Sequence, residues 1–438
     1  DANDFGYVAP QFATGPVNFI IGGAYNDFQN ALDDQYALYN DQWLFIGSDL
    51  APSGAQVFTS STDGSSDNNT RLNIVGYIDT AYDCLPSGYG YFHETMEDGQ
   101  YYKNSIDHAK IGNDIAAQSA TMRRVDLMGA ETWGSIFLFN DLSENVNFMG
   151  LCFYGTSRTQ FPIQLNTGTY GSVHAAHCVL LIDNPELGSY GLFRIHRAGS
   201  GGNIHDCYIY NTKVIDENVG LDAVVSHFDI SNCCLECSGG VIHQSYNSTT
   251  IHHCIMKAGH TPIAIVGHGH LIAYNNVFYC EHTPVIDHWS LASLHSQKGS
   301  MVVYNNIYCA DLTADSETYQ GIVRVIDGGE LRYWDYNLIY DLAGNPWPQN
   351  KKVYLTDGYN SSWKGQYGVT FGVNDIFDTD PLFVDPGNWN FQLRPGSPCL
   401  GAGRPDTQDN PTDIGLTPKH SQNNNLYGNN VPLSLIHI

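Results

Sequence analysis

A short phrase that recurs between residues 145 and 340 constrains this chain more than any other feature of its sequence. The phrase is a run of residues typical of β-strands, then a polar pair that ends in Cys or Asn, then two apolar residues. The second polar residue marks each copy, and the markers lie 21 to 31 residues apart: Cys152, Cys178, Cys207, Cys233, Cys254, Asn276, Asn306 and Asn337. A period of about 20–50 residues indicates a stack of similar structural units.

The repeated unit is β, because Val, Ile, Tyr, Phe and Thr surround each marker in short runs that Asn, Gly, Asp and Ser interrupt. Variable spacing around a constant phrase is typical of coils whose loops differ in length while their stacked strands keep register. The sequence therefore predicts an all-β chain folded as a right-handed parallel β-helix, a solenoid with about 4.8 Å between coils. The markers should form an internal ladder, in which Asn amides hydrogen-bond along the stack and buried thiols fill the same small space.

The chain divides into four predicted regions. Residues 1–50 are predicted to be an N-terminal cap, with an amphipathic helix over 27–39 and a first strand at Trp43–Gly47. Residues 51–144 are early coils with a lateral excursion at about 79–115, residues 145–415 are regular coils with a closing segment, and residues 416–438 are an extended tail. The near copies Arg71–Gly76 and Arg124–Gly129 are predicted to occupy the same strand of successive coils.

A second strand can be aligned to the ladder. Pro262 and Pro284 each stand eight residues after a ladder residue, and similar phrases occur in other coils. The predicted strands of this second face are Leu192–Arg197, Gly240–Gln244, Thr261–His268, Thr283–Trp289 and Ile322–Asp327. This face carries most of the polar side chains that are candidates for chemistry.

Charge and cysteine content narrow the class of protein. The chain has 45 acidic and 19 basic residues, for a formal charge of −26, which argues against nucleic-acid binding and against an anionic polysaccharide unless cations bridge the contact. No apolar run is long enough to span a membrane. A start at Asp1 without Met is compatible with a processed protein, so we expect an extracellular, virion or cell-surface location. Most of the 11 cysteines are predicted to be reduced and buried, because side chains at neighbouring ladder positions point in parallel.

Both ends of the chain resemble a known superfamily. Phe12-Ala13-Thr14, followed by the predicted helix and strand, resembles the opening of pectin-lyase-like and phage-tailspike-like β-helix proteins, although Gly15–Asn26 is inserted here. The segment from Asp378 to Gly415, with its phrase Asp378-Thr-Asp-Pro-Leu-Phe-Val-Asp, is similar over about 40 residues to the closing phrase of secreted and virion right-handed β-helix proteins. The resemblance implies the fold and says little about activity.

Two functions stay open. The first is a structural or recognition β-helix of the tailspike, fibre or adhesin type that contacts carbohydrate and assembles as a trimer or filament. The second is a secreted polysaccharide lyase or glycoside hydrolase that acts along the second face. The catalytic candidates are Asp287, His288, Arg324 and Asp327, and the substrate-binding candidates are Arg194, His196, His243, His268 and Trp289.

Metal binding is a weaker expectation. The acidic loops Asp63–Asn69 and Asp375–Asp385 offer oxygen ligands for Ca²⁺, without the spacing of an EF-hand. Histidines cluster between residues 174 and 295, and hydrogen bonding within turns explains their abundance better than a metal site does.

Overall fold

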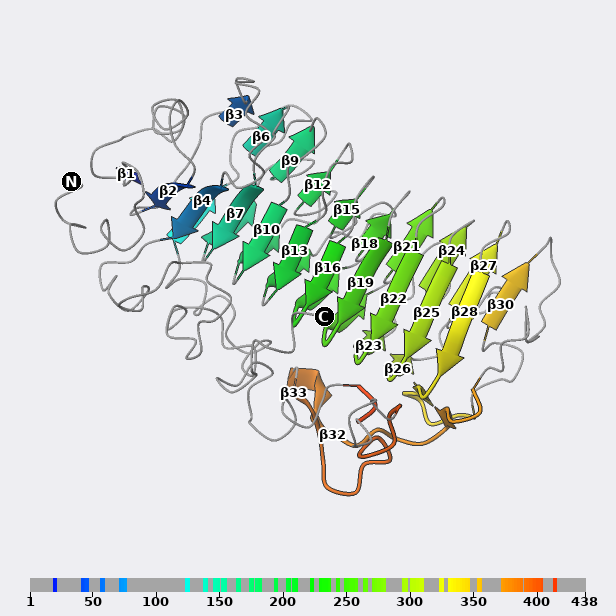
Figure 1. Cartoon of the computed structure of the whole chain (residues 1–438). Helices are drawn as coiled ribbons and strands as arrows, with labels where there is room; N and C mark the ends of the chain where they lie inside the picture. The colour runs from blue at the N-terminus through cyan, green and yellow to red at the C-terminus, as the bar shows by residue number, and fades with distance from the viewer. Residues whose placement is uncertain are drawn as a thin grey trace.

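The described part of the chain is a stack of short parallel strands, arranged in three long sheets (Figure 1). The computed structural model describes residues 19–21, 41–46, 56–59, 71–76, 123–126, 137–140, 145–149, 151–155, 163–166, 173–176, 178–182, 193–195, 202–205, 207–211, 221–223, 228–237, 242–244, 248–258, 263–266, 270–280, 294–297, 300–310, 323–326, 330–346, 353–356, 372–388, 390–404 and 413–415. From β7 to β30, each coil passes through sheet A, sheet B and sheet C in that order.

Sheet A has eleven strands, which stack in chain order. They are β1 (Phe19–Ile21), β2 (Asp41–Ile46), β4 (Arg71–Gly76), β7 (Asn145–Met149), β10 (Val173–Ala176), β13 (Gly202–His205), β16 (Phe228–Ser231), β19 (Ser248–His252), β22 (His270–Tyr274), β25 (Ser300–Tyr304) and β28 (Glu330–Asp335).

Sheet B has ten strands, which also follow chain order. They are β5 (Arg123–Asp126), β8 (Leu151–Gly155), β11 (Val179–Ile182), β14 (Tyr208–Asn211), β17 (Cys234–Cys237), β20 (Ile255–Ala258), β23 (Val277–Cys280), β26 (Ile307–Ala310), β29 (Leu338–Asp341) and β31 (Ile376–Phe377).

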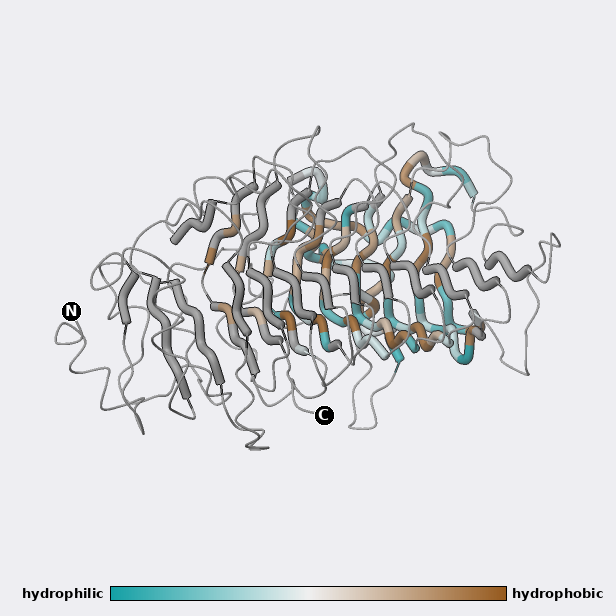
Figure 2. Tube along the Cα trace, turned by 90° about the horizontal axis from the view of Figure 1, so that it is seen from above, coloured by the Kyte–Doolittle hydropathy of each residue, from teal (hydrophilic) through white to brown (hydrophobic). Residues whose placement is uncertain are grey.

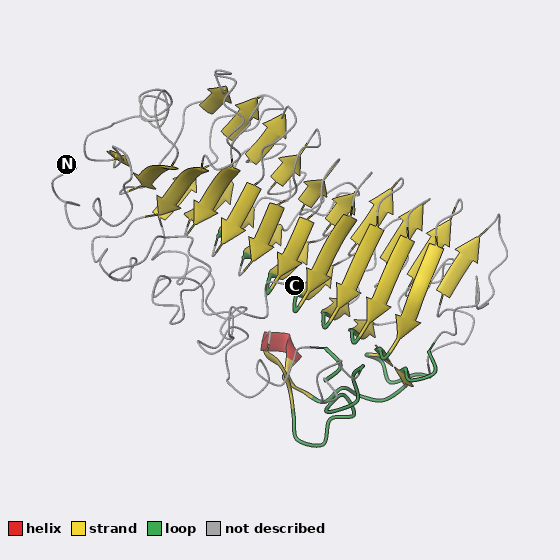
Figure 3. Cartoon of the chain, in the orientation of Figure 1, coloured by secondary structure: helices red, strands yellow, loops and turns green. Residues whose placement is uncertain are grey.

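Sheet C has ten strands as well. They are β3 (Gln56–Thr59), β6 (Phe137–Asn140), β9 (Ile163–Asn166), β12 (Phe193–Ile195), β15 (Leu221–Ala223), β18 (Ile242–Gln244), β21 (Ile263–Val266), β24 (Leu294–Gln297), β27 (Val323–Ile326) and β30 (Val353–Thr356). Among the described residues, the only helical element is the 3-10 turn η6 (Pro386–Asn388), drawn red in Figure 3. For the described residues these three sheets confirm the all-β class and are consistent with a parallel β-helix.

A left-handed residue makes the sharp turn from sheet A to sheet B in each well-described coil. The φ angle lies between 52° and 58° at Asn232, His253, Asn275, Asn305 and Tyr336. Asn enters this conformation more easily than most residues, which accounts for its frequency at the first position of the repeated phrase. The ladder residue follows directly and starts the path into sheet B.

The core lies inside the coils, where alternate residues of each strand are apolar. In sheet A one inward row runs through neighbouring strands with no more than 1% exposure: Ala175, Ile204, Ile230, Ile251, Ala273, Val303 and Trp334. In sheet B the rings of Phe278 and Tyr308 stack at 4.6 Å, and Tyr308 stacks on Trp334 at 5.5 Å. Figure 2 shows hydrophobic segments recurring from coil to coil between hydrophilic turns.

The closing segment, residues 378–415, covers the outer face of sheet B. It contains the antiparallel pair β32 (Phe383–Asp385) and β33 (Asn390–Leu393), which lies beside the later coils in Figure 1. The apolar cluster beneath it joins both sides of the contact: Tyr208, Cys234, Ile255, Val277, Tyr279, Ile307, Cys309 and Leu338 from sheet B, with Phe383, Phe391, Leu393, Cys399 and Ile414 from the closing segment. Sheet B is therefore buried on both faces in this region.

The near copies Arg71–Gly76 and Arg124–Gly129 do not share a strand position, so that prediction is wrong. The first is β4 of sheet A, whereas Arg123–Asp126 is β5 of sheet B. The two segments share a similar sequence pattern, and the pattern alone does not decide which sheet a strand joins. At the N-terminus, β1 lies within the insertion Gly15–Asn26, and the predicted helix over 27–39 lies outside the described residues, as does the excursion at 79–115.

Candidate functional site

The predicted ladder is present from Cys178 onward. Cys178, Cys207, Cys233, Cys254, Asn276, Asn306 and Asn337 are all fully buried. The register corrects the first position: Val179 pairs with Cys152, so Leu151, also fully buried, is level with Cys178. Cys152 was misplaced by one position because apolar residues stand on both sides of it. The sequence alone therefore does not show whether residue 151 or residue 152 is level with Cys178, and only the pairing of strands decides this.

Asn residues of the ladder bind one another in one direction along the stack. The backbone N–H of Asn276 donates to Asn306 Oδ1 at 3.0 Å, and the backbone N–H of Asn306 donates to Asn337 Oδ1 at 3.0 Å. Each Asn Nδ2 also donates to a backbone carbonyl, as Asn306 Nδ2 does to Ala273 O at 3.0 Å. Buried amide groups are thus satisfied on both sides, as low-dielectric surroundings require.

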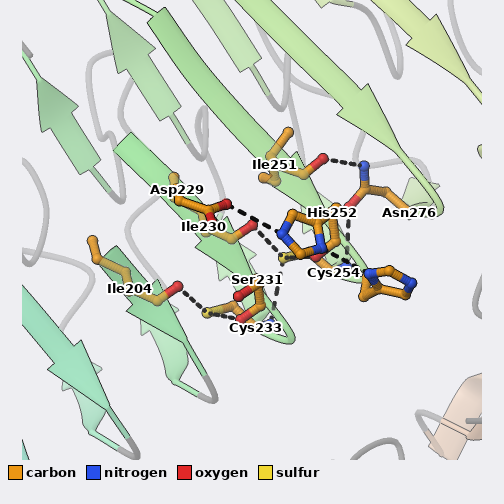
Figure 4. Close-up of polar contacts among 10 residues, drawn as sticks. Ile204, Asp229, Ile230, Ser231, Cys233, Ile251, His252, Cys254 and Asn276 are labelled. Atoms are coloured by element: carbon orange, nitrogen blue, oxygen red, sulfur yellow. Dashed lines mark hydrogen bonds and ion pairs between the residues drawn. The ribbon is translucent and has the colours of Figure 1, made fainter. Parts of the chain in front are cut away.

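Cys residues make the same contacts more weakly. Cys254 Sγ donates to His252 O at 3.3 Å and accepts from the backbone N–H of Cys233 at 3.4 Å (Figure 4). The backbone N–H of Cys254 donates to Asn276 Oδ1 at 3.0 Å, which joins the thiol and amide halves of the ladder. Burial raises the pKa of the Cys207 and Cys233 thiols well above the ordinary value, so both stay protonated and able to donate. The ladder residues Cys207, Cys233 and Cys254 are free thiols, as predicted, and Cys399 is also a free thiol.

Asp375 is a ladder residue that the sequence interpretation missed. Because Leu338 pairs with Ile376, Asp375 is level with Asn337, and its Oδ1 accepts the Asn337 backbone N–H at 2.7 Å. The signal was available, since Asn374-Asp375-Ile-Phe has the order of Asn275-Asn276-Val-Phe. Its spacing of 38 residues from Asn337 falls outside the range of the other copies, and the acidic residue was instead interpreted as part of a Ca²⁺ loop.

Three of the predicted site residues lie on strands of sheet C at one register position. Arg194 in β12, His243 in β18 and Arg324 in β27 belong to a single row of paired residues. We call this row the sheet C row: Gln164, Arg194, Asp222, His243, Ala264, His295, Arg324 and Tyr354. Its members Asp222 and His295 were not among the predicted site residues, although Asp222 lies between the apolar residues Leu221 and Ala223, as Arg194 lies between Phe193 and Ile195.

The other predicted site residues lie outside the described residues: His196, His268, Asp287, His288, Trp289 and Asp327. The strand that pairs with β21 is β24 at Leu294–Gln297, and not the predicted phrase Thr283–Trp289. The alignment of Pro284 with Pro262 therefore fails at strand level, because the loop between β23 and β24 is longer than the equal spacing implied. Catalytic and binding roles for these residues stay predictions.

A chain of polar contacts crosses the corner between sheets A and B. His252 Nε2 lies 3.2 Å from Asp229 Oδ1, His252 Nδ1 lies 2.8 Å from His253 Nδ1, and His253 Nε2 lies 3.2 Å from Asn275 Nδ2. Figure 4 shows the Asp229 and His252 side chains facing each other from neighbouring strands. Since Asn275 Nδ2 can only donate, a neutral His253 carries its proton on Nδ1 and donates it to His252, whose Nε2–H then faces Asp229.

This corner does not form a Ser-His-Asp triad. Ser231 pairs in register with His252, but both ring nitrogens of His252 have other partners. The fully buried Ser231 Oγ has no hydrogen-bond partner among the residues that the structure describes. A nucleophile needs a base within hydrogen-bonding reach and access to its substrate. The arrangement orders the corner and does not supply acyl-transfer chemistry.

A row of stacked aromatic rings extends from this corner along neighbouring coils. His252 stacks on Tyr274 at 4.9 Å, and Tyr274 stacks on Tyr304 at 5.2 Å. The Arg404 guanidinium of the closing segment lies 5.1 Å from the Tyr304 ring centroid and 5.0 Å from that of Tyr333. The stacked rings cover each other's faces, so their edges are what the surface presents.

The structure and the comparisons with known proteins were searched for a metal site, a membrane span and relatives. Within the described ranges, no group of three or more His, Cys, Asp or Glu side chains is arranged to hold a metal ion. The described residues also contain no helix with the length and hydropathy of a membrane span. No protein-family model matches the sequence, and no curated protein matches it either.

Proposed function

We propose that this chain is a surface-exposed or secreted recognition scaffold of the tailspike, fibre or adhesin type, built as a right-handed parallel β-helix whose sheet C flank contacts carbohydrate. The observation that supports the proposal is the sheet C row, in which Arg194 of β12, His243 of β18 and Arg324 of β27 share one register position. Polar side chains at one register position, separated by whole numbers of coil steps, suit a ligand that is itself a linear repeat.

The dimensions of the row favour a polymer over a small molecule. Five coil steps separate Arg194 in β12 from Arg324 in β27. At about 4.8 Å per step, the two positions lie roughly 24 Å apart, which is the length of several sugar units in an extended glycan. The formal charge of −26 favours neutral or weakly acidic glycans, because the rest of the molecule repels polyanions.

Glycan binding with matched variants tests this proposal. We expect Arg194→Ala and Arg324→Ala to lower affinity for a bound oligosaccharide at least tenfold in calorimetric titration. Arg332→Ala, which removes an exposed arginine from β28 of sheet A, is the matched control and should bind as the unmodified protein does. Equal binding by all three variants, or no binding to any neutral or acidic polysaccharide, would contradict the proposal.

The second candidate function is a secreted polysaccharide lyase or glycoside hydrolase that acts on the same flank. It is favoured by the presence of both Arg and His in the sheet C row, because a lyase needs a cation to neutralise a uronate and a base to remove its proton. Incubation with the same polysaccharides, followed by assays for new reducing ends and unsaturated products, separates the two functions. Cleavage that is lost in Arg324→Ala, Asp287→Asn or Asp327→Asn variants with intact circular dichroism would establish the enzyme.

Assembly and cation dependence belong to the same proposal. A trimer or filament is expected for a fibre-type protein, and sedimentation at several concentrations measures it. Glycan titrations with added Ca²⁺ or with a chelator test whether cations bridge the contact.

A further inference from the structure

Every titratable residue on the described strands of sheet C lies at one register position, the sheet C row (Figure 1). The titratable members of the row are Arg194, Asp222, His243, His295, Arg324 and Tyr354. All other residues of these strands are apolar or carry a neutral amide or hydroxyl group. Ionic contacts that these strands make with a ligand are therefore confined to a single line along the stack.

The line consists of two groups on either side of Ala264 in β21. The mixed group occupies three successive strands, β12, β15 and β18: Arg194, Asp222 and His243. The basic pair occupies β24 and β27: His295 and Arg324. Ala264 separates the groups because it pairs with the last member of the first and with the first member of the second. The mixed group contains an acid between two basic residues, whereas the basic pair contains no acid.

Charges within the mixed group compensate each other. Asp222 is one strand away from Arg194 on one side and from His243 on the other, and neighbouring strands lie about 4.8 Å apart. Opposite charges at this separation are within the screening length of salt solution, so the carboxylate offsets the charge of Arg194. An anion above the mixed group therefore meets attraction and repulsion of similar size.

The basic pair has no such compensation within the row. Asp222 is three strands away from His295 and four from Arg324, which is roughly 14 Å and 19 Å. Both distances exceed the screening length of about 8 Å at physiological salt. The row neighbours of Arg324 are His295 and Tyr354, and neither is an acid at neutral pH. A guanidinium group binds a carboxylate through two parallel hydrogen bonds, and a neighbouring imidazole offers a further N–H donor.

We propose that the basic pair binds one acidic sugar of a glycan whose neighbouring sugars, along the mixed group, are neutral. This inference rests on the proposed recognition function and names the ligand class of the same flank. A second acidic sugar above the mixed group would meet Asp222, and the formal charge of −26 opposes any chain that carries many anions. The ligand is therefore a heteropolysaccharide with widely spaced acidic groups, and its acidic sugar lies at the β24–β27 end of the row.

Calorimetric titration with three oligosaccharides of equal length tests the proposal. The first has a uronic acid at one sugar in four, the second is its carboxyl-reduced neutral form, and the third is an oligouronate with an acid on every sugar. The unmodified protein should bind the first about tenfold more tightly than either of the others. This preference should shrink as salt is added, because salt screens the contact between charges.

Matched variants assign the preference to the basic pair. Arg324→Gln keeps a hydrogen-bonding group but removes the charge, so this variant should bind the acidic form no better than the neutral form. Arg194→Gln is the same substitution at a compensated position of the row, and it should lower the affinity for both forms by the same factor. Asp222→Asn removes the acid beside Arg194, so affinity for the oligouronate should rise by about tenfold.

The preference is a ratio of two affinities in one protein, so a variant that folds incompletely lowers both affinities and leaves the ratio interpretable. Equal affinity of the unmodified protein for the acidic and neutral forms would overturn the proposal and leave glycan recognition intact. A preference that survives in Arg324→Gln, or is lost in Arg194→Gln, would also overturn it. Absence of binding to all three oligosaccharides would overturn both the recognition function and the assignment of the basic pair.

Discussion

The ladder position accepts both Cys and Asn because each side chain offers an acceptor to the coil before it and a donor to a nearby carbonyl. Cys233 Sγ donates to Ser231 O at 3.2 Å, and Asn306 Nδ2 donates to Tyr304 O at 3.0 Å, in each case two residues back along the chain. Similar volume and similar bonding make the two residues functional equivalents at this place, with the amide forming the stronger bonds.

Replacing Asn306 tests this equivalence. Asn306→Ala removes the acceptor of the Asn276 N–H and one donor each from Ala273 O and Tyr304 O in a fully buried place, so the free energy of unfolding should fall by about 2–4 kcal/mol. Asn306→Cys should lose less than half of that. Asn345→Ala, at an exposed position, should change stability by no more than about 0.5 kcal/mol. Urea denaturation measures all three, and equal losses for Ala and Cys at position 306 would contradict the interpretation.

The ladder could be predicted from sequence because a small polar residue, Cys or Asn, recurs at the same place in each copy of the phrase even though the spacing between copies varies. Its two errors have physical causes. Cys152 was misplaced by one position, since apolar residues flank the marker on both sides, and Asp375 was missed because a long loop precedes it. Catalytic and binding roles stay predictions. They depend on which loops surround sheet C, and the length of a loop does not show which residues it brings next to a given strand.

At the scale of elements, the closing segment is held to sheet B at points where its backbone comes very close. The Gly415 N–H donates to Asn305 O at 2.6 Å, and a Cβ atom at Gly415 would lie 2.5 Å from Ile307 Cδ1. The φ angle of Gly415 is +83°, which L-residues rarely adopt. Glycine is thus required both by conformation and by the approach to Ile307.

Two glycine variants separate these requirements. Gly415→Ala combines a left-handed backbone with overpacking against Ile307 and should reduce the free energy of unfolding by about 2–4 kcal/mol. Gly344→Ala also has a positive φ, +75°, but its Cβ would meet no atom within 4 Å. It should therefore cost only about 1 kcal/mol. Thermal denaturation gives the comparison, and similar losses in the two variants would show that the contact with Ile307 is readily relieved.

Sequence pattern predicted where strands occur better than it predicted which strands pair with each other. Four of the five predicted phrases contain a strand of this sheet, because alternating apolar residues mark a strand wherever it occurs. The near copies in β4 and β5 were assigned to one sheet, although similar patterns arise on any face that meets the common core. Sequence pattern identifies strands, and pairing decides their neighbours.

For the molecule as a whole, the covered outer face of sheet B makes stability depend on the closing segment. A chain cut after Asp380 would expose the apolar side chains of Ile255, Val277 and Ile307 on adjacent strands. We expect this truncated chain to bind the dye ANS strongly and to associate in a concentration-dependent manner, because a broad apolar patch favours self-association. A monodisperse truncated chain with the dye binding of the intact protein would contradict this expectation.

The one-way hydrogen bonding of the ladder gives the stack a direction. The backbone N–H of each rung donates to the side-chain oxygen of the rung that follows. The last rung, Asp375, has a side chain that only needs to accept, and an ionised carboxylate does so. We therefore expect that coils inserted ahead of Asp375 would leave the hydrogen bonds of the last rung unchanged. The number of coils can therefore vary as a unit, and the ladder residue of the last coil, Asp375, differs chemically from the Cys and Asn residues of the coils before it.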